Sequence, residues 1–157
     1  MDIQFQRSDD AAYFNRMTNH PSISPFIRDD STQGELDFSK VDMNACHCLK
    51  CLIEGREAGF AILVPTDDGL ELHSGLLPEF RGRTAIEAGK ELVRWAYTQT
   101  NCRKLTTWAW DNSRHVLLVT KAIGFAEDSR RDWPHTVNGK HVQQVHFTID
   151  FDNSKLA

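Results

Sequence analysis

The segment from Gly69 to Ala96, GLELHSGLLPEFRGRTAIEAGKELVRWA, constrains the fold and function of this chain more than any other. It predicts a strand that ends near Pro78, then a tight basic turn, Arg81-Gly82-Arg83, and then a helix. Such a turn directs backbone N–H groups at one point, where the helix dipole adds partial positive charge. With two arginines beside it, the turn is expected to bind a phosphate or pyrophosphate.

The composition narrows the class of protein. The chain has 157 residues, of which 40% are hydrophobic and 25% charged, so we expect one globular domain spanning residues 1–157. The net charge of −4 argues against a nucleic-acid partner, which would require a basic surface. No apolar run is long enough to span a membrane, and the N-terminus lacks a signal peptide. We therefore expect a cytoplasmic protein, a monomer or a homodimer, with free cysteines.

The hydrophobic patterns predict elements in the order β-α-loop-β-β-β-α-β-α-β-β. The expected strands are residues 3–5, 46–53, 59–64, 70–77, 104–110, 126–131 and 141–151, and the expected helices are 9–18, 84–98 and 112–122. Ser8 or Asp9 is the expected cap of the first helix. The long irregular segment 19–44 is expected to lie over a substrate site. This order predicts an α/β (α+β) fold around a mostly antiparallel sheet.

Three stretches, in this order, resemble the GCN5-related N-acetyltransferase (GNAT) family. LLPEFRGRTAIEA is similar to the family's acyl-CoA pyrophosphate loop, and DNSRHVLLVTKAIGF is similar to its later helix, which ends in a Gly-Phe pair. GFAEDSRRDWPHTVNGKHVQQVHFTI is similar to the closing hairpin of members that acetylate protein N-termini and small amines. The segment PFIRDD and the general pattern also resemble small GNAT-like proteins encoded by tailed phages.

The resemblance implies a central sheet of six to seven strands with about four helices. It also implies direct acetyl transfer from the thioester of acetyl-CoA, as co-substrate, to an amine of a small molecule or protein, without a metal. The pantetheine arm would lie beside Ser74–Leu77, with backbone groups of Leu76 and Leu77 as partners. The pyrophosphate would bind at Arg81, Gly82, Arg83, Thr84, Ala85 and Ile86. Asn112 is expected to cap its helix or to touch the cofactor arm, and capping is favoured by its residue type.

Candidate catalytic residues come from the strand and the second helix. Glu71 and His73 lie two residues apart on one strand and share a face, so either could be the base that deprotonates the amine. His115 is a candidate for proton transfer, and Thr120 for a weak acid or a hydrogen-bond donor to CoA. Each of these residues also fits an ordinary role on a strand or on a solvated helix face.

The long segment supplies three candidate substrate-binding residues. Phe26, Asp29 and Asp30 lie within it, and the acidic pair is expected to attract a cationic amine. The same pair also fits a plain solvated turn, because Asp favours turn positions.

Two positions depart from the family's pattern and support a second hypothesis. The family's loop is Q/R-x-x-G-x-G/A, whereas this chain has Thr84 and Ile86 where the later glycines are expected. Thr120 stands where the family often places a tyrosine as general acid. The alternative is therefore a catalytically weak or inactive protein of this fold, phage-encoded, that binds and modulates a host protein in the host cytoplasm.

The sequence Cys46-His47-Cys48-Leu49-Lys50-Cys51 has the residue types of a zinc site but not the geometry. In a strand, Cys46 and Cys48 face one side while His47 and Cys51 face the other. We therefore expect buried free thiols and no metal. Trp108 and Trp110 also share a strand face, and core packing is their expected role.

Overall fold

A computed structural model of the chain describes residues 1–152. In this range the sheet has seven strands, and there are three α-helices rather than about four. The strands are β1 Ile3–Arg7, β2 His47–Ile53, β3 Arg56–Pro65, β4 Leu70–Leu76, β5 Lys104–Trp110, β6 Ala126–Asp132 and β7 Gln143–Asp150. The helices are α1 Ala11–Thr18, α2 Arg83–Gln99 and α3 Arg114–Ile123. The predicted order of elements is confirmed.

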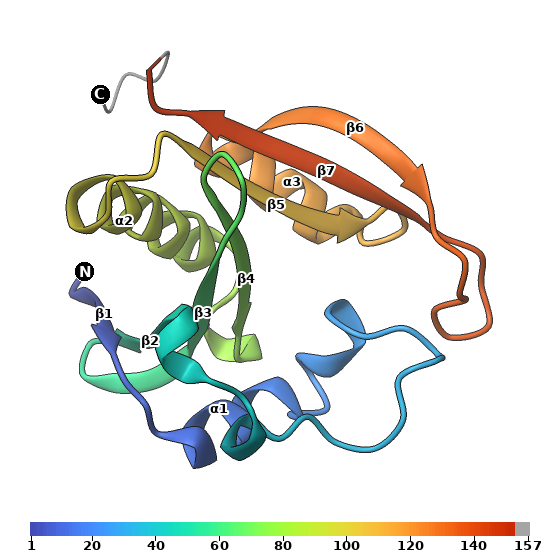
Figure 1. Ribbon diagram of the computed structural model, residues 1–157, viewed down its shortest axis with the longest axis horizontal. Helices are drawn as coiled ribbons and strands as arrows, with labels where there is room; N and C mark the ends of the chain where they lie inside the picture. The colour runs from blue at the N-terminus through green and yellow to red at the C-terminus, as the bar shows by residue number, and fades with distance from the viewer. Residues whose placement is uncertain (153–157) are drawn as a thin grey trace.

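The strands form one mixed sheet in the order β1-β2-β3-β4-β5-β7-β6, and all neighbours are antiparallel except β4 and β5. α1 and the segment that follows it lie on one face of the sheet, and α2 and α3 lie on the other (Figure 1). α2 connects β4 to the parallel strand β5, and α3 connects β5 to β6. Both connecting helices therefore lie next to the line where β4 and β5 meet.

Three local boundaries differ from the sequence prediction because of specific caps and turns. Asp10, not Ser8 or Asp9, is the N-cap of α1, and its carboxylate accepts a hydrogen bond from the Tyr13 N–H. Ser113, not Asn112, is the N-cap of α3, so Asn112 lies outside the helix and caps nothing. The β2–β3 turn is only two residues long, because Glu54 and Gly55 both adopt the positive φ that such hairpin turns require.

The core has apolar clusters on both faces of the sheet. On the face covered by α2, the cluster includes Leu49, Leu63, Leu92 and Phe147. On the other face, the cluster includes buried side chains of α1 and the following segment, namely Tyr13, Phe14, Met17 and Ile23. The neighbouring β2 residues Cys48 and Leu49 belong to clusters on opposite faces, which fixes the register of this strand.

Three of the four cysteines follow this alternation. Cys48 and Cys46 belong to the α1 side, whereas Cys51 faces the opposite side of the sheet. Burial raises the pKa of the Cys48 thiol to about 11 and that of Cys51 to about 12. Within residues 1–152, no three His, Cys, Asp or Glu side chains gather in a way that would hold a metal ion.

The long segment is anchored to the rest of the molecule at several points. It contains three short 3-10 turns, Ser24–Phe26, Phe38–Lys40 and Met43–Ala45. The side-chain oxygens of Asn15 and Asn19 on and after α1 accept hydrogen bonds from the Phe38 and Leu36 N–H groups. Gly75 on β4 lets the segment approach closely, since a Cβ there would lie 2.7 Å from Cγ2 of Ile23. The helices of the described range are all too short or too polar to cross a membrane.

Candidate active site

β4 and β5 diverge after a very short parallel ladder. They pair only at Leu70 with Leu105 and at Glu71 with Thr106. One step further along, the Thr107 hydroxyl donates a 3.0 Å hydrogen bond to the Leu72 carbonyl, so a side chain replaces the backbone ladder. Beyond this point the two strands separate, as Figure 1 shows.

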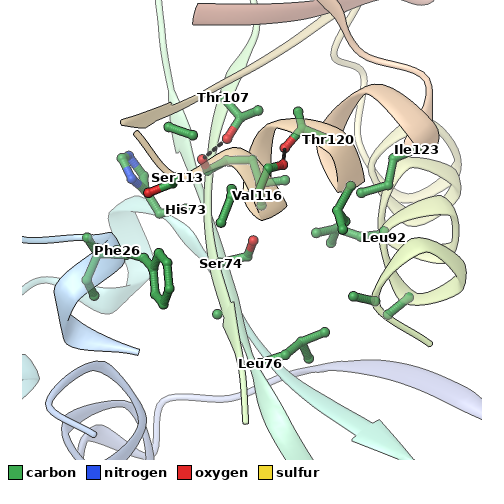
Figure 2. Close-up of a pocket in the computed structure, with 18 of the residues that line it drawn as sticks. Phe26, His73, Ser74, Leu76, Leu92, Thr107, Ser113, Val116, Thr120 and Ile123 are labelled. Atoms are coloured by element: carbon green, nitrogen blue, oxygen red, sulfur yellow. Dashed lines mark hydrogen bonds between the residues drawn. The ribbon is translucent and has the colours of Figure 1, made fainter. Parts of the chain in front are cut away.

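A pocket of about 230 Å³ occupies this gap and opens on both faces of the sheet. Because side chains alternate along a strand, His73 and Trp108 reach it on the α1 face, whereas Ser74 and Leu76 reach it on the helical face. Figure 2 shows Phe26 and His73 on one side of β4, and Leu92 and Ile123 on the other. A ligand lying in the pocket would therefore pass through the sheet between the two strands.

The helical side of the pocket is apolar and closely packed. Val116, Val119, Thr120 and Ile123 of α3 line it together with residues of α2. The Thr120 hydroxyl donates a 2.7 Å hydrogen bond to the Val116 carbonyl (Figure 2). Its proton therefore points to the backbone of α3 and not to the pocket. His115, in the first turn of α3, is exposed and lines the rim.

The free backbone groups at the gap belong to Ser74 and Leu76. Carbonyls alternate in direction along a strand, and those of Leu70 and Leu72 point toward β5, where threonine hydroxyls bind them. By the same alternation, the Ser74 N–H and C=O and the Leu76 N–H point into the gap. The Leu76 carbonyl accepts from Nε of Arg81 at 3.2 Å, and the Leu77 N–H donates to the Ala58 carbonyl at 2.9 Å. Leu77 does not line the pocket, and its N–H is used in the hydrogen bond to Ala58.

The N-terminus of α2 lies at one end of the pocket, where Gly82 and Ala85 line it. Gly82 is the N-cap at φ 76°, which favours glycine, and it makes no side-chain capping bond. The first turn of this helix has no acidic residue, so its N–H groups and the positive end of the dipole carry no compensating negative charge. Arg83 is exposed beside them, while Thr84 and Ile86 lie in the first turn outside the pocket lining.

Arg81 points back into the protein rather than outward from the turn. Besides the Leu76 carbonyl, its guanidinium binds the Ser22 carbonyl and lies 5.3 Å from the centre of the Phe26 ring. These contacts fasten the long segment to the turn before α2. Arg81 and Phe26 both line the pocket, and Phe26 keeps 39% of its surface exposed.

Glu71 and His73 form a pair on the α1 face of β4. Oε1 of Glu71 lies 2.8 Å from Nε2 of His73, and the two side chains are about one-third exposed. His73 lines the pocket and Glu71 does not. The imidazole also packs edge-on against Trp108, with ring centres 6.3 Å apart. Glu71 and Trp108 therefore hold the ring in one orientation, with the other nitrogen, Nδ1, not bound by Glu71.

Asp29 and Asp30 lie outside the pocket lining and bind the β6–β7 hairpin. Asp29 accepts hydrogen bonds from Ser31 and, at 2.7 Å, from the Trp133 indole N–H. Hydrogen bonds, first of all that from the Ser31 side chain, lower the pKa of Asp29 to about 2. Asp30 accepts from the Thr136 hydroxyl and from the N–H groups of the Asn138-Gly139 turn.

The structure brings about half of the candidate residues together at one pocket. Those that line it are Phe26, His73, Leu76, Arg81, Gly82, Ala85, His115 and Thr120. Those outside the lining are Asp29, Asp30, Glu71, Leu77, Arg83, Thr84, Ile86 and Asn112. Sequence reasoning did not assign Trp108, Trp110 or Ile23 to the pocket. The period-two pattern of Trp108 and Trp110 was a usable signal, whereas nothing local marked Ile23.

The fold matches solved structures of acetyltransferases. The chain superimposes on spermidine N-acetyltransferase from Vibrio cholerae, solved with CoA and spermine, with a TM-score of 0.78 over 96% of each chain at 13% identity. It also matches ribosomal-protein-S5-alanine acetyltransferase from Vibrio fischeri, with a TM-score of 0.73 over 98% of this chain and 94% of that one at 14% identity.

A third structural match is an acetyltransferase of the GNAT family from Streptococcus pneumoniae, with a TM-score of 0.70 over 95% of this chain and 99% of that one at 12% identity. Neither the protein-family models nor the curated protein sequences give a match. The chain therefore has the fold of the GNAT acetyltransferases, as the sequence resemblance predicted.

Proposed function

We propose that the protein is an acetyl-CoA-dependent N-acetyltransferase that transfers the acetyl group directly to an amine. The observation that supports this proposal is the pocket in the gap between β4 and β5. The N-terminus of α2, which has no side-chain cap, lines this pocket on the helical face of the sheet. His73, which is paired with Glu71, lines it on the other face. The structural match to an enzyme solved with CoA supports acetyl-CoA as the co-substrate.

The cofactor would bind from the helical side. The pantetheine arm would lie against β4 and bind the free backbone groups of Ser74 and Leu76, much as a further strand would. The pyrophosphate would bind the N–H groups in the first turn of α2, where the dipole favours negative charge. Arg83 would add a full charge at this point, since Arg81 is held by Ser22 and Leu76.

The amine would enter from the α1 face, where His73 lies. With Nε2 of His73 donating its proton to Glu71, Nδ1 keeps a lone pair that accepts a proton from the amine. The neutral amine nitrogen attacks the thioester carbonyl and an N–C bond forms, while its proton passes to Nδ1 of His73. The C–S bond then breaks, and CoA leaves as the thiolate. A thiol of ordinary pKa near 8.5 is a good leaving group as the anion, so the step does not require Thr120 as an acid.

Titration calorimetry with CoA and acetyl-CoA tests the cofactor half of the proposal. We expect binding of both, and we expect Arg83→Glu to weaken it at least about tenfold, since a charge-assisted contact contributes roughly 1.5–3 kcal/mol. Arg94→Glu is the matched control, because Arg94 is exposed on the same helix near its other end. No binding at millimolar CoA by the wild-type protein would reject the proposal.

One observation favours a second candidate function. Arg81 is committed to internal contacts, and the first turn of α2 carries Thr84 and Ile86 where the family's loop has glycine. A protein that has kept the fold but lost the cofactor would then serve as a binding module for a host protein. Affinity capture from a bacterial lysate by wild type and by Arg81→Ala should then recover the same single partner.

A further inference from the structure

The charge of the pocket restricts which amines it can accept. Among the described residues that line it, none is an aspartate or a glutamate. The ionisable side chains in the lining are Arg81, His73 and His115. An ammonium group buried there would lose its hydration without gaining a carboxylate partner, which is costly. The reacting amine escapes this cost because it must be neutral to attack, but a second ammonium on the same molecule would not.

Four carboxylates outside the lining, those of Glu71, Asp29, Asp30 and Asp111, make contacts within the protein. Asp29 binds the Trp133 indole and Ser31, and Asp30 binds the β6–β7 turn. Oδ1 of Asp111 accepts a hydrogen bond from the Gln143 N–H. Glu71 lies 2.8 Å from His73 and outside the pocket lining. A second ammonium would have to share each of these carboxylates with the contact that it already makes in the segment, the hairpin or the His73 pair.

The same side of the pocket offers aromatic and aliphatic surface instead. Trp108 packs on Trp110 with ring centres 4.7 Å apart, and both line the pocket with Phe26, Ile23 and Phe60. Phe26 and His73 lie on the same side of β4 in Figure 2. Burial of an aromatic body here would be favoured by the hydrophobic effect and, in addition, by each well-placed contact between aromatic rings.

A cation over the face of Trp108 would be stabilised by a cation–π contact, but this stabilisation is smaller than the cost of removing the cation from water and burying it as an unpaired charge. The Arg81 guanidinium, which lies over the Phe26 ring at 5.3 Å, adds a repulsive charge on the same side. The electrostatics of the site therefore disfavour polyamines.

We propose that the acceptor is a small monoamine on an aromatic or apolar body, of the kind represented by 2-phenylethylamine, and that polyamines are poor substrates. This inference rests on the proposed acetyltransferase function. In the reaction the amine nitrogen forms the amide bond, its proton passes to His73, and the acetyl C–S bond breaks to release CoA. The site thus differs in acceptor preference from the structural neighbour solved with spermine.

The test compares 2-phenylethylamine with spermidine as acceptors for the full-length protein and acetyl-CoA. CoA release is followed with a thiol reagent and the products by mass spectrometry. We expect kcat/KM for 2-phenylethylamine to exceed that for spermidine by more than about tenfold, which corresponds to 1.4 kcal/mol. A binding readout that needs no turnover is calorimetry of each amine into the protein saturated with CoA.

Two variants sharpen the comparison. Trp108→Ala should lower kcat/KM for 2-phenylethylamine at least about tenfold and leave the Kd for CoA unchanged, because Trp108 lies on the amine side. Trp95→Ala is the matched control, since Trp95 lies on α2 outside the pocket and contacts Arg7 and His47. Far-ultraviolet circular dichroism and thermal melts establish that both variants fold.

The outcomes separate this inference from the function on which it rests. If CoA does not bind, the acetyltransferase proposal fails and the acceptor inference falls with it. If CoA binds but spermidine is acetylated as well as or better than 2-phenylethylamine, only the acceptor inference is overturned. CoA binding with neither amine bound or acetylated likewise overturns it.

Discussion

Oε1 of Glu71 lies 2.8 Å from Nε2 of His73, and only the histidine of this pair reaches the pocket. This arrangement gives the two residues different roles, although the sequence left open which of them is the base. Under the proposed function, the carboxylate would fix the imidazole in the tautomer whose Nδ1 accepts a proton, and the imidazole would contact the amine.

Removal of His73 should therefore cost more activity than removal of the Glu71 charge. We expect His73→Ala to lower kcat/KM for the amine about 10²–10⁴-fold and Glu71→Gln about tenfold, since a positioned general base contributes in this range. Added imidazole should restore part of the activity of His73→Ala. His141→Ala is the control, because His141 is exposed and outside the pocket. Activity of His73→Ala within threefold of wild type would exclude His73 as the base.

The hydrogen bonds that Asp29 accepts from Ser31 and from Trp133 should make the stability of the fold depend on acidic pH. Hydrogen bonds lower the pKa of Asp29 to about 2, below its ordinary value near 3.9. The stabilisation is therefore fully present above about pH 4 and is lost as the pH falls toward 2. We expect Asp29→Asn to be less stable than wild type at pH 7, with the difference shrinking between pH 4 and 2 in urea unfolding.

The control for this experiment is Asp67→Asn, because Asp67 is an exposed residue of the β3–β4 turn. Its stability difference from wild type should stay small at every pH. A difference for Asp29→Asn that is the same at pH 7 and pH 2 would show that the ionised carboxylate does not stabilise the fold.

Substitution by alanine should change the stability of the protein by different amounts at two glycines. A Cβ at Gly59 would lie 2.0 Å from the Gly75 carbonyl oxygen, which is backbone of the paired strand. A Cβ at Gly89 would lie 2.1 Å from Cδ1 and 2.5 Å from Cγ1 of Ile123, which are atoms of a side chain rather than of the backbone. Gly59→Ala should cost about 2–4 kcal/mol in the free energy of unfolding. Gly89→Ala should change it by less than about 1 kcal/mol, because alanine also favours the helix. Equal losses in chemical denaturation would contradict this.

Features that depend on residues close together in the sequence could be predicted, whereas features that depend on residues far apart in the sequence could not. Strands such as Lys104–Trp110 and the Asn138-Gly139 turn could be predicted because alternation and turn chemistry are local. The inward orientation of Arg81 could not, because it depends on the Ser22 carbonyl, 59 residues away. Asp29 and Asp30 likewise bind a hairpin more than 100 residues further along the chain. Residue type alone therefore placed Asp29 and Asp30 at the substrate, whereas long-range packing holds them against the hairpin.

The buried cysteines should be protected from thiol reagents in the folded protein. Burial raises the pKa of Cys48 to about 11 and of Cys51 to about 12, and only the thiolate reacts readily. Cys46 and Cys102 are partly exposed. At pH 8 we expect iodoacetamide to modify these two first, with Cys48 and Cys51 modified only after denaturation. Peptide mapping by mass spectrometry would reveal early modification of Cys51, which would contradict its placement in the core.

Arg81 should act mainly by holding the long segment over the pocket. Its guanidinium binds the carbonyls of Ser22 and Leu76 and covers Phe26, so its removal frees the segment from the turn before α2. We expect Arg81→Ala to increase hydrogen exchange in residues 22–27 and to raise the KM for the amine, while the Kd for CoA changes less than about threefold. Arg83→Ala is the comparison, and it should weaken CoA binding without changing exchange in that segment. A large loss of CoA affinity in Arg81→Ala, with unchanged exchange, would instead assign Arg81 to the pyrophosphate.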